Sequence, residues 1–153
     1  MEIRQPDATD IEAIVDLWVR LAADQQAYGS HLLADENRAP IRETISRHVI
    51  SDGLLVARES TLIGFVMFRE EVGQFKRTVT RGIIENIYVI PDRRGEGIGS
   101  ELLNAAEVAL VAGGAEVIVL EVLADNEDAQ RFYREHGYEP HRMEFARELN
   151  GTD

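Results

Sequence analysis

The chain has 153 residues, 28 acidic and 16 basic side chains, and a formal net charge of -12 at pH 7. This length fits one domain, residues 1–153, which can bury roughly two thirds of its unfolded surface without a disulfide or a metal. The negative charge argues against nucleic acid as a partner, because binding it requires a Lys/Arg surface. The sequence has no cysteine and its four histidines lack metal-site spacing, which argues against thiol catalysis and a bound metal.

The start of the chain and the scarcity of lysine bear on where the protein works. Met1 precedes a polar segment with no basic n-region and no long apolar run, so we expect no membrane association and a cytoplasmic location. Lys76 is the only lysine, whereas arginine is frequent. An acidic surface with so little lysine is typical of adaptation to high salt, since hydrated carboxylates keep a protein in solution. The alternative is an acidic protein from an ordinary cell.

Apolar periodicity predicts elements in the order β-α-α-β-β-β-α-β-α-β, which indicates an α/β protein of the α+β type. Thr9 and Glu12 have the form of a capping box at the first helix, and Pro40 suits the first turn of the second. The elements are a strand over residues 2–5, helices over 9–24 and 40–51, strands over 54–58, 62–70 and 82–90, a helix over 97–112, a strand over 116–122, a helix from 125 or 126 to 136, and a strand over 138–148.

An apolar strand, a proline and a glycine-spaced loop follow one another between Ile87 and Ser100, and the loop opens a helix. The loop has three glycines at alternate positions: Gly95, Gly97 and Gly99. Because glycine has no Cβ, the backbone can approach a ligand, and successive N–H groups can point at an anion. The helix adds the positive end of its dipole, and Arg93 and Arg94 add charge. The stretch therefore predicts a diphosphate site.

Glycine-spaced loops also occur in plain turns and in two other nucleotide-binding motifs. A simple strand-to-helix turn would need glycines as well. The sequence has no Gly-Lys-Ser/Thr, which excludes a P-loop NTPase, and the loop lies deep in the chain, which disfavours a Rossmann dinucleotide fold. The order Arg94-x-x-Gly97-x-Gly99 instead resembles the pyrophosphate motif of the GNAT superfamily, the acetyl-CoA-dependent N-acyltransferases.

The downstream sequence resembles the same superfamily. Leu120-Glu121-Val122 reads as a strand end, Asn126 follows, and Tyr133 comes seven residues later, just before a Gly-aromatic step. The resemblance runs from Ile3 to about Leu149. It implies a GNAT-like fold, in which about four helices flank a mixed central sheet that is splayed between its fourth and fifth strands.

The resemblance also implies that acetyl-CoA is the cofactor. The pantetheine arm would enter the gap between the fourth and fifth strands and pair with the free edge of the fourth, while the pyrophosphate would lie on the glycine loop. Asn126 would bond the arm, cap the next helix, or do both. The expected coenzyme-binding residues are Ile87, Tyr88, Val89, Arg94, Gly95, Glu96, Gly97, Ile98, Gly99, Ser100 and Asn126.

Tyr133 is the expected general acid. Acetyl transfer delivers a proton to the departing thiolate, and a phenol with a pKa of about 10 can donate it at neutral pH; a packed tyrosine ring is the alternative. The base is left open between Glu121 and Glu85, the latter expected on the same side of its strand as Ile87 and Val89. A carboxylate among apolar residues would have a raised pKa, which suits a base. Either carboxylate could instead pair with an arginine.

The resemblance implies an N-acetyltransferase that acts on a primary amine, of a small molecule or a protein, by direct attack in a ternary complex. A second hypothesis is a coenzyme A-binding sensor or interaction module of the same fold without turnover. The motifs also leave open another acyl-CoA, an alcohol acceptor, and a homodimer. They do not identify the amine.

Overall fold

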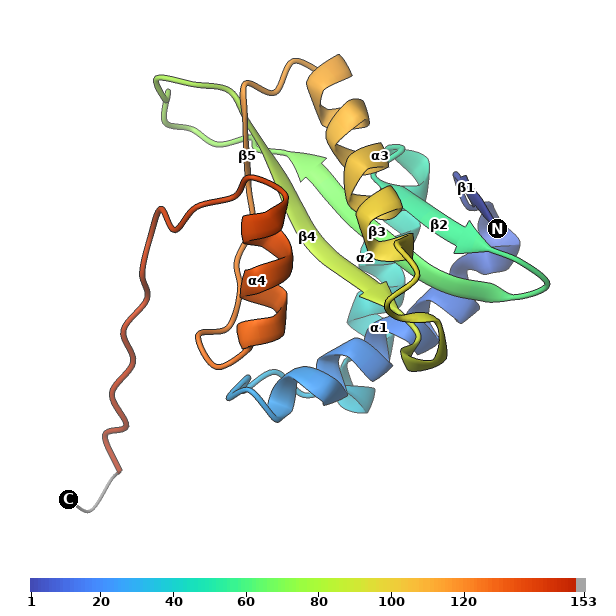
Figure 1. Ribbon diagram of the computed structural model, residues 1–153, viewed down its shortest axis with the longest axis horizontal. Helices are drawn as coiled ribbons and strands as arrows, with labels where there is room; N and C mark the ends of the chain where they lie inside the picture. Colours follow the sequence, from blue (N-terminus) through green and yellow to red (C-terminus); the bar gives the residue numbers. More distant parts are fainter. Residues whose placement is uncertain (151–153) are drawn as a thin grey trace.

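The computed structural model describes residues 1–150 and contains a five-stranded sheet in the order β1-β2-β3-β4-β5 (Figure 1). The strands are β1 (Glu2–Arg4), β2 (Leu54–Arg58), β3 (Leu62–Glu70), β4 (Arg81–Val89) and β5 (Val117–Val119). The first four strands pair antiparallel, whereas β5 pairs with β4 in parallel. The expected mixed sheet of an α+β protein is therefore confirmed.

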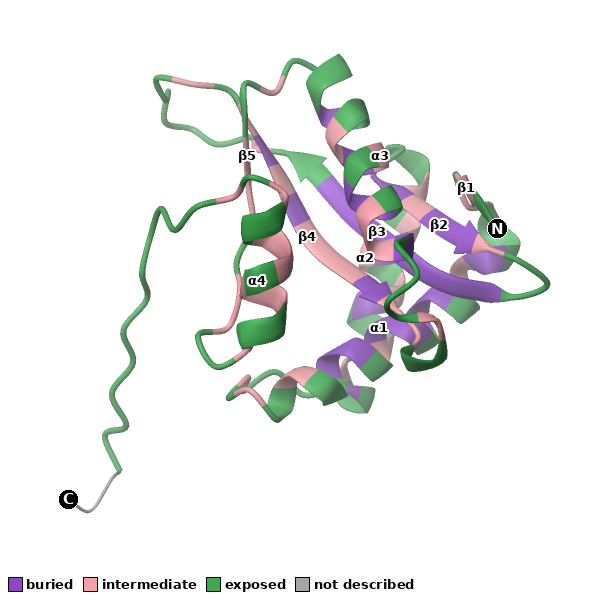
Figure 2. Cartoon of the chain, in the orientation of Figure 1, coloured by how far each residue is buried: buried purple, intermediate pink, exposed green. Residues whose placement is uncertain are grey.

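Helices cover both faces of this sheet (Figure 1). The helices are α1 (Ile11–Gln26), α2 (Arg38–Ile50), α3 (Ile98–Ala112) and α4 (Glu127–Glu135), and short 3-10 turns lie at Ala8–Asp10, Asp35–Asn37 and Pro91–Arg93. On one face, α1 and α2 pack through Ile14 and Ile45 onto Phe65 of β3. On the other, α3 packs through Leu102 and Leu103. These buried residues appear in purple in Figure 2.

The sheet opens between β4 and β5. The two strands pair only at the start of β4, and the last paired residues are Ile83 and Val119. Beyond this point, the rest of β4 keeps β3 on one side and has no strand on the other within residues 1–150. This splay is the one that the resemblance to the GNAT superfamily implies.

A β-bulge interrupts β4 at Glu85. Asn86 pairs with Met67 and Ile84 with Phe68, so Glu85 is an extra residue that opposes none. A bulge reverses the alternation of side chains along a strand. Glu85 therefore points to the α2 face, while Ile87 and Val89 pack with the α3 cluster. The expectation that Glu85 shares a side with these two residues is wrong.

The first helices begin differently from the expectation. The capping box is formed by Asp7, which accepts from the N–H of Thr9 at 2.9 Å, and by Asp10, which accepts from the N–H of Asp7 at 3.0 Å. The expected box of Thr9 and Glu12 is wrong, because a 3-10 turn starts the helical path earlier. Pro40 does lie in the first turn of α2, where its missing N–H removes no intrahelical bond.

The C-terminal segment, residues 138–150, forms no strand. It leaves α4 as an extended chain that runs away from the sheet, and most of it is exposed (Figures 1 and 2). The predicted strand over 138–148 is therefore wrong for this chain on its own, and β5 is shorter than the predicted 116–122. Alternation of apolar and polar side chains makes a segment suited to a sheet, but a strand also needs a neighbour to pair with.

Within residues 1–150, no helix is both long and apolar enough to cross a membrane.

Candidate functional site

The glycine loop joins the splayed end of β4 to α3. Gly95 and Gly97 have φ of 82° and 83°, a left-handed conformation that favours glycine, and a Cβ at either would meet no atom within 4 Å. Gly97 is the N-cap of α3 and offers no side-chain cap. The N–H of Glu101 bonds the Gly97 carbonyl at 3.1 Å, and the three N–H groups before it have no intrahelical acceptor. The loop thus has donors at the positive end of a helix, beside open space.

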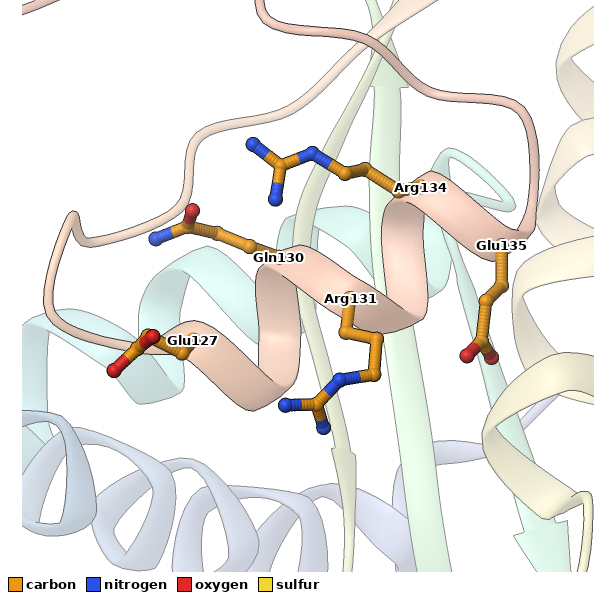
Figure 3. Close-up of a pocket in the computed structure, with 5 residues that line it drawn as sticks. All are labelled: Glu127, Gln130, Arg131, Arg134 and Glu135. Atoms are coloured by element: carbon orange, nitrogen blue, oxygen red, sulfur yellow. The ribbon is translucent and has the colours of Figure 1, made fainter.

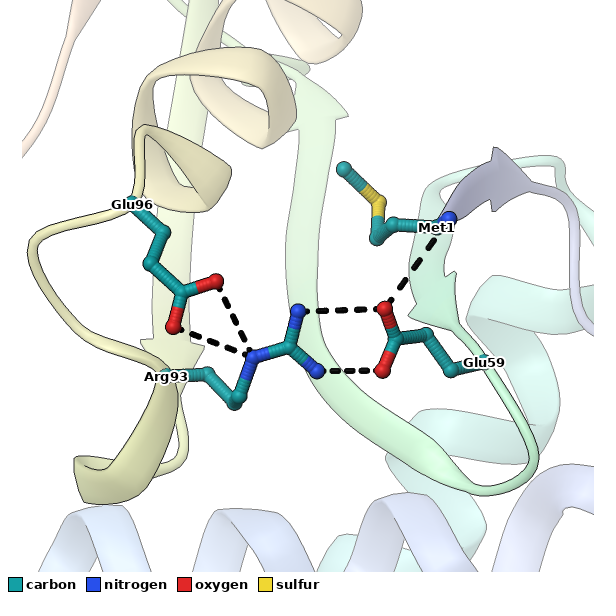
Figure 4. Close-up of polar contacts among 4 residues, drawn as sticks. All are labelled: Met1, Glu59, Arg93 and Glu96. Atoms are coloured by element: carbon teal, nitrogen blue, oxygen red, sulfur yellow. Dashed lines mark hydrogen bonds and ion pairs between the residues drawn. The ribbon is translucent and has the colours of Figure 1, made fainter.

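Arg93 does not offer a free charge to this loop. Its guanidinium binds both carboxylate oxygens of Glu59, and its Nε lies 3.1 Å from Oε1 of Glu96 (Figure 4). Glu59 also lies 3.9 Å from the N-terminal amine of Met1. These hydrogen bonds raise the pKa of Arg93 and lower that of Glu59. Arg93 therefore ties the loop to the turn between β2 and β3, which the sequence did not predict.

Arg94 folds back over the end of β4. Its Nε donates to the carbonyl of Val89 at 2.9 Å, and its guanidinium lies 5.3 Å from the centre of the Tyr88 ring. The terminal nitrogen is 3.7 Å from Asp24 of α1. Because half of its side chain is exposed, Arg94 keeps a positive charge available at the open end of β4. Tyr88 itself is buried on the α1 and α2 face.

The N-terminus of α3 and helix α4 meet directly. A Cβ on Gly99 would lie 3.6 Å from the ring of Phe132 and 3.9 Å from Val89. His136 makes a hydrogen bond at each ring nitrogen, since Nδ1 lies 2.7 Å from the carbonyl of Phe132 and Nε2 lies 3.0 Å from Oγ of Ser100. The carbonyl can only accept, so Nδ1 carries hydrogen, while Nε2 shares a hydrogen bond with the serine hydroxyl. No spacing in the sequence indicates this contact of His136.

Tyr133 is largely covered by the same packing. Its ring makes edge-to-face contacts with Phe132 at 5.2 Å and with Tyr138 at 5.9 Å, and burial raises its pKa to about 12. A phenol with this pKa stays protonated at neutral pH. Asn126 is the N-cap of α4, because its Oδ1 accepts from the N–H of Ala129 at 3.1 Å. The capping role expected of Asn126 is thus present.

Glu85 lies in a charged cluster on the opposite face. Its Oε1 is 2.6 Å from Nε2 of His48, and its Oε2 is 3.4 Å from Nε of Arg69. Nδ1 of His48 is 2.8 Å from the carbonyl of Thr44, so both ring nitrogens face acceptors and the ring is held as an imidazolium. His48, which the sequence did not single out, therefore neutralises Glu85.

The pKa of Glu85 is lowered, not raised as expected of a carboxylate among apolar residues. Burial raises the pKa, but the hydrogen bond from His48 and the charges of His48 and Arg69 outweigh it. In turn, the hydrogen bond to Glu85 raises the pKa of His48. Glu121 differs in its surroundings: it is exposed and lies two residues beyond Val119, where β5 ends.

The expected coenzyme-binding residues from 87 to 100 thus lie where β4, the loop and α3 meet, and α4 packs Tyr133 against the same cluster. Asn126, which belongs to the same expected set, lies apart from them in the sequence and caps the start of α4. A hollow of about 370 Å³ lies elsewhere, on the outer side of α4 (Figure 3). It is lined by Glu127, Gln130, Arg131, Arg134 and Glu135. All of them come from one helix, and none belongs to the expected site. We therefore assign the candidate site to the splay and not to this hollow.

Comparisons with known proteins agree with the fold. A sequence profile of the Acetyltransferase (GNAT) family matches residues 18–138. N-alpha-acetyltransferase 30 from Schizosaccharomyces pombe is 35% identical over 91 residues, which are 60% of this chain and 59% of that protein. Aminoalkylphosphonate N-acetyltransferase from Salmonella typhimurium is 38% identical over 68 residues, which are 44% of each chain. The match thus spans only part of either relative.

A solved structure resembles nearly the whole chain. The aminoglycoside N-acetyltransferase AAC(6')-Iy in complex with CoA superposes with a TM-score of 0.70 at 21% identity, over 97% of this chain and 94% of that one. At this level of identity, the likeness concerns the fold.

Proposed function

Because the chain belongs to the GNAT acetyltransferase family, we propose that it transfers the acetyl group of acetyl-CoA to a primary amine in a ternary complex. The observation that carries this proposal is the junction of β4 with α3. In the described part of the chain, residues 1–150, no strand pairs with the edge of β4 beyond Ile83, and β4 leads into a loop and a helix start with free N–H groups. An extended amide chain suits such an edge, and a diphosphate suits such a helix start.

The residues at this junction fit coenzyme A. Ile87, Tyr88 and Val89 would pair with the pantetheine amides through their backbone, and the N–H groups of residues 94–100 would hold the pyrophosphate. The open space beside the loop glycines leaves room for the diphosphate. Arg94 would supply positive charge, whereas Arg93 is engaged with two carboxylates. The side-chain N–H of Asn126 would remain for the coenzyme arm while its Oδ1 caps α4.

Tyr133 would deliver the proton to sulfur. The amine nitrogen forms a bond to the thioester carbonyl carbon, the carbon–sulfur bond breaks, and the thiolate takes a proton while the amine loses one. With a pKa of about 12, Tyr133 holds its proton more tightly than a thiol of pKa ~8.5 does. Complete transfer of its proton to the thiolate is therefore uphill, so the phenol would donate a hydrogen bond to the departing sulfur, and the proton that the amine releases would restore the phenol once the thiol has formed.

Glu121 would be the base that takes the amine proton. Glu85 is held by an imidazolium and a guanidinium, and its lowered pKa makes it a weak base. Glu121 is exposed and close to the end of β5, where the splay opens. Comparing Glu121→Gln with Glu85→Gln separates the two candidates, because loss of the base removes the acidic limb of the rate profile. Loss of that limb in Glu85→Gln alone would assign the base to Glu85.

The acceptor would be a neutral or cationic primary amine. The net charge of -12 favours approach of such an amine over an anionic one. The relatives include an N-alpha-acetyltransferase and an aminoalkylphosphonate N-acetyltransferase, so both protein and small-molecule amines belong in the test.

The proposed activity is tested by release of free thiol from acetyl-CoA in the presence of a panel of peptides and small amines, with the acetylated product identified by mass spectrometry. We expect thiol to be released only when a suitable amine is present, in an amount equal to that of the acetylated product. A protein that retains coenzyme A through purification but acetylates no amine of the panel would favour the second hypothesis, a coenzyme-binding module. That hypothesis draws support from Glu85, whose carboxylate is already neutralised.

A further inference from the structure

His136 connects the end of α4 to the start of α3. It is the C-cap of α4, and its own N–H bonds the carbonyl of Tyr133 at 3.0 Å, so the carbonyl of Phe132 accepts from Nδ1 of the ring at 2.7 Å. The other ring nitrogen, Nε2, lies 3.0 Å from Oγ of Ser100. The ring of Phe132 packs on the imidazole, with 4.5 Å between the ring centres. These contacts hold the imidazole in one orientation toward α3.

The hydroxyl of Ser100 lies at the part of α3 where the diphosphate is proposed to bind. Ser100 is the third residue after the N-cap Gly97, and its N–H is one of the three that have no intrahelical acceptor. Helical side chains point back toward the N-terminus of their helix. The hydroxyl therefore lies on the side of the free N–H groups, where its hydrogen can also reach an oxygen of a diphosphate.

The protonation of His136 decides where the single hydrogen of this hydroxyl goes. The carbonyl of Phe132 can only accept, so Nδ1 keeps its hydrogen in either form of the ring. In the neutral ring, Nε2 has no hydrogen and accepts the one of Ser100. In the imidazolium, Nε2 donates to Oγ instead. The hydroxyl hydrogen is then released for another acceptor.

We propose that His136 is a positioning residue for the coenzyme: its imidazolium donates to Ser100, and the serine hydroxyl donates to the diphosphate. This inference rests on the proposed function, which places the diphosphate at the start of α3. The only covalent change is the binding of one proton from solvent to Nε2. A ligand that binds the protonated form more tightly also raises the fraction of protein in that form. Coenzyme affinity should therefore increase as the pH falls through the range where histidine gains its charge, about pH 8 to 5.

The charged groups near the ring are occupied or exposed. Among residues 1–150, no carboxylate oxygen lies within 4.0 Å of the ring nitrogens of His136. Glu107 of α3 binds the hydroxyl of Tyr138, and Glu96 of the loop binds Arg93. The phenols of Tyr133 and Tyr138 have raised pKa values and stay neutral. The remaining charged groups on the adjoining helices are exposed, and they are Glu101 of α3 and Arg134 and Glu135 of α4.

The two helix ends at His136 act on its charge in opposite directions. The C-terminal end of α4 favours an imidazolium, whereas the N-terminal end of α3 disfavours it. A bound diphosphate would neutralise the positive end of α3 and add an opposite charge near the ring, which favours the charged form of histidine. Binding of the diphosphate and uptake of the proton should therefore support each other.

Calorimetric titration at pH 6 and pH 9 tests the dependence on the proton. The probe is acetyl-dephospho-coenzyme A, which keeps the diphosphate but has neither the 3′-phosphate nor a free thiol, two groups that would titrate in this range. We expect the wild type to bind at least about 10-fold more tightly at pH 6, the worth of one hydrogen bond to a charged group. Titration at pH 7.5 in buffers of different ionisation enthalpy should show uptake of protons on binding.

Three variants distinguish this role of His136 from packing. Ser100→Ala removes the hydroxyl and keeps the histidine, so binding at pH 6 should weaken to about the wild-type value at pH 9 and lose its pH dependence. His136→Asn can still donate to the carbonyl of Phe132 but is too short to reach Ser100, and it should behave in the same way. His136→Gln offers Ser100 an N–H that does not titrate. It should bind tightly at both pH values.

His141→Asn is the matched control, because His141 is exposed in the segment after α4, and it should keep the pH dependence of the wild type. Circular dichroism checks that each variant is folded, and Ser100→Ala places a strong helix former in α3. A pH dependence that persists in Ser100→Ala would show that the imidazolium acts without the hydroxyl and would overturn the inference. Equal affinity of the wild type at both pH values would overturn it while leaving the proposed function intact. A wild type that binds no coenzyme would overturn both.

Discussion

At the residue scale, the charged side chains near the site fall into two sets: those neutralised by ion pairs and those that stay accessible. Arg93 and Glu85 each carry a charge that neighbouring side chains neutralise. Arg94 and Glu121 remain accessible. Tyr133 keeps its proton because burial raises its pKa. The chemistry proposed for the site therefore depends on Arg94, Glu121 and Tyr133. The ion pairs of Arg93 and Glu85 instead hold elements of the fold together.

Tyr133→Phe tests the proposed acid. The variant keeps the ring and its packing but lacks the proton, so we expect turnover to fall by roughly 10²-fold while the affinity for coenzyme A changes little. Because the pKa of Tyr133 is about 12, loss of its proton should not reduce the rate of the wild type below roughly pH 11. Steady-state kinetics and calorimetry measure the two effects.

Tyr138→Phe is the matched control for this substitution. It removes a hydroxyl from a ring that contacts Tyr133, but this hydroxyl is bound to Glu107. It should lower stability more than turnover. Near-native turnover of Tyr133→Phe would return Tyr133 to a packing role, with the proton supplied by solvent.

The pair of His48 and Glu85 predicts a pH-dependent stability. The pKa of His48 is raised above its ordinary 6.5, so its contribution is complete below that pH and is lost as the pH rises through the raised value. The pKa of Glu85 is lowered from 4.5, so its contribution is complete above that pH and is lost as the pH falls through the lowered value. Both contributions are complete between pH 4.5 and pH 6.5, so the pair should stabilise the fold most in this range.

The measurement is urea unfolding of the wild type and His48→Asn at pH 5.5 and pH 9. We expect the variant to be less stable, and the difference to shrink at the higher pH. His141→Asn serves as the control, because His141 is exposed, and it should give no such dependence. A difference that is equal at both pH values would show that His48 acts by packing and not by charge.

At the scale of elements, the bulge in β4 and the glycine loop determine the direction of the Glu85 side chain and of the backbone N–H groups before α3. The bulge at Glu85 directs this side chain toward α2, and within residues 1–150 the part of β4 after Ile83 has no partner strand on the β5 side. The loop then turns through two glycines with positive φ before α3 begins at Ile98. Backbone conformation, more than side-chain identity, thus builds the proposed coenzyme site.

Gly97→Val tests the loop. Valine at a φ of 83° is strained, so we expect a loss of stability of about 1–3 kcal/mol. Displacement of the N–H groups from the diphosphate should weaken coenzyme A binding by roughly 10- to 100-fold, the worth of hydrogen bonds to a charged group. Chemical unfolding and isothermal titration measure the two effects.

Gly114→Val is the matched control for strain. Gly114 has a φ of 103° and also faces open space, but it follows the other end of α3. We expect a similar loss of stability with unchanged coenzyme affinity. If both variants bind coenzyme A equally well, the loop does not hold the diphosphate.

At the scale of the whole molecule, carboxylates outnumber the cations that could pair with them. Many arginines bind acidic partners, as in the contacts of Arg42 with Glu12 and of Arg81 with Glu71. The net charge of -12 nevertheless leaves an excess of repulsion in the folded state. Salt weakens both the attraction within ion pairs and the repulsion between like charges. Because repulsion is in excess, salt should stabilise the folded state.

We therefore expect the melting temperature at pH 7 to rise from dilute buffer to molar potassium chloride. The rise should continue beyond about 0.15 M, where the screening length is about 8 Å and exposed ion pairs are already weakened. Sucrose at equal osmolality controls for exclusion of the cosolute from the surface. A melting temperature that stays flat or falls with salt would remove the argument for salt adaptation.

Periodicity and glycine spacing are local properties of the chain, so they predicted the order of the elements as far as α4 and the glycine loop, whereas the splayed sheet was implied by the resemblance to the GNAT superfamily. Tertiary packing determined which groups meet. His48 and Glu85 are 37 residues apart, Arg93 and Glu59 are 34 apart, and His136 and Ser100 are 36 apart. No local pattern specifies such pairs, since they depend on the register of strands and on the bulge in β4. The segment after α4 makes the same point: its alternation of apolar and polar side chains predicts a strand, but no strand forms within residues 138–150, because a strand also needs a neighbour to pair with.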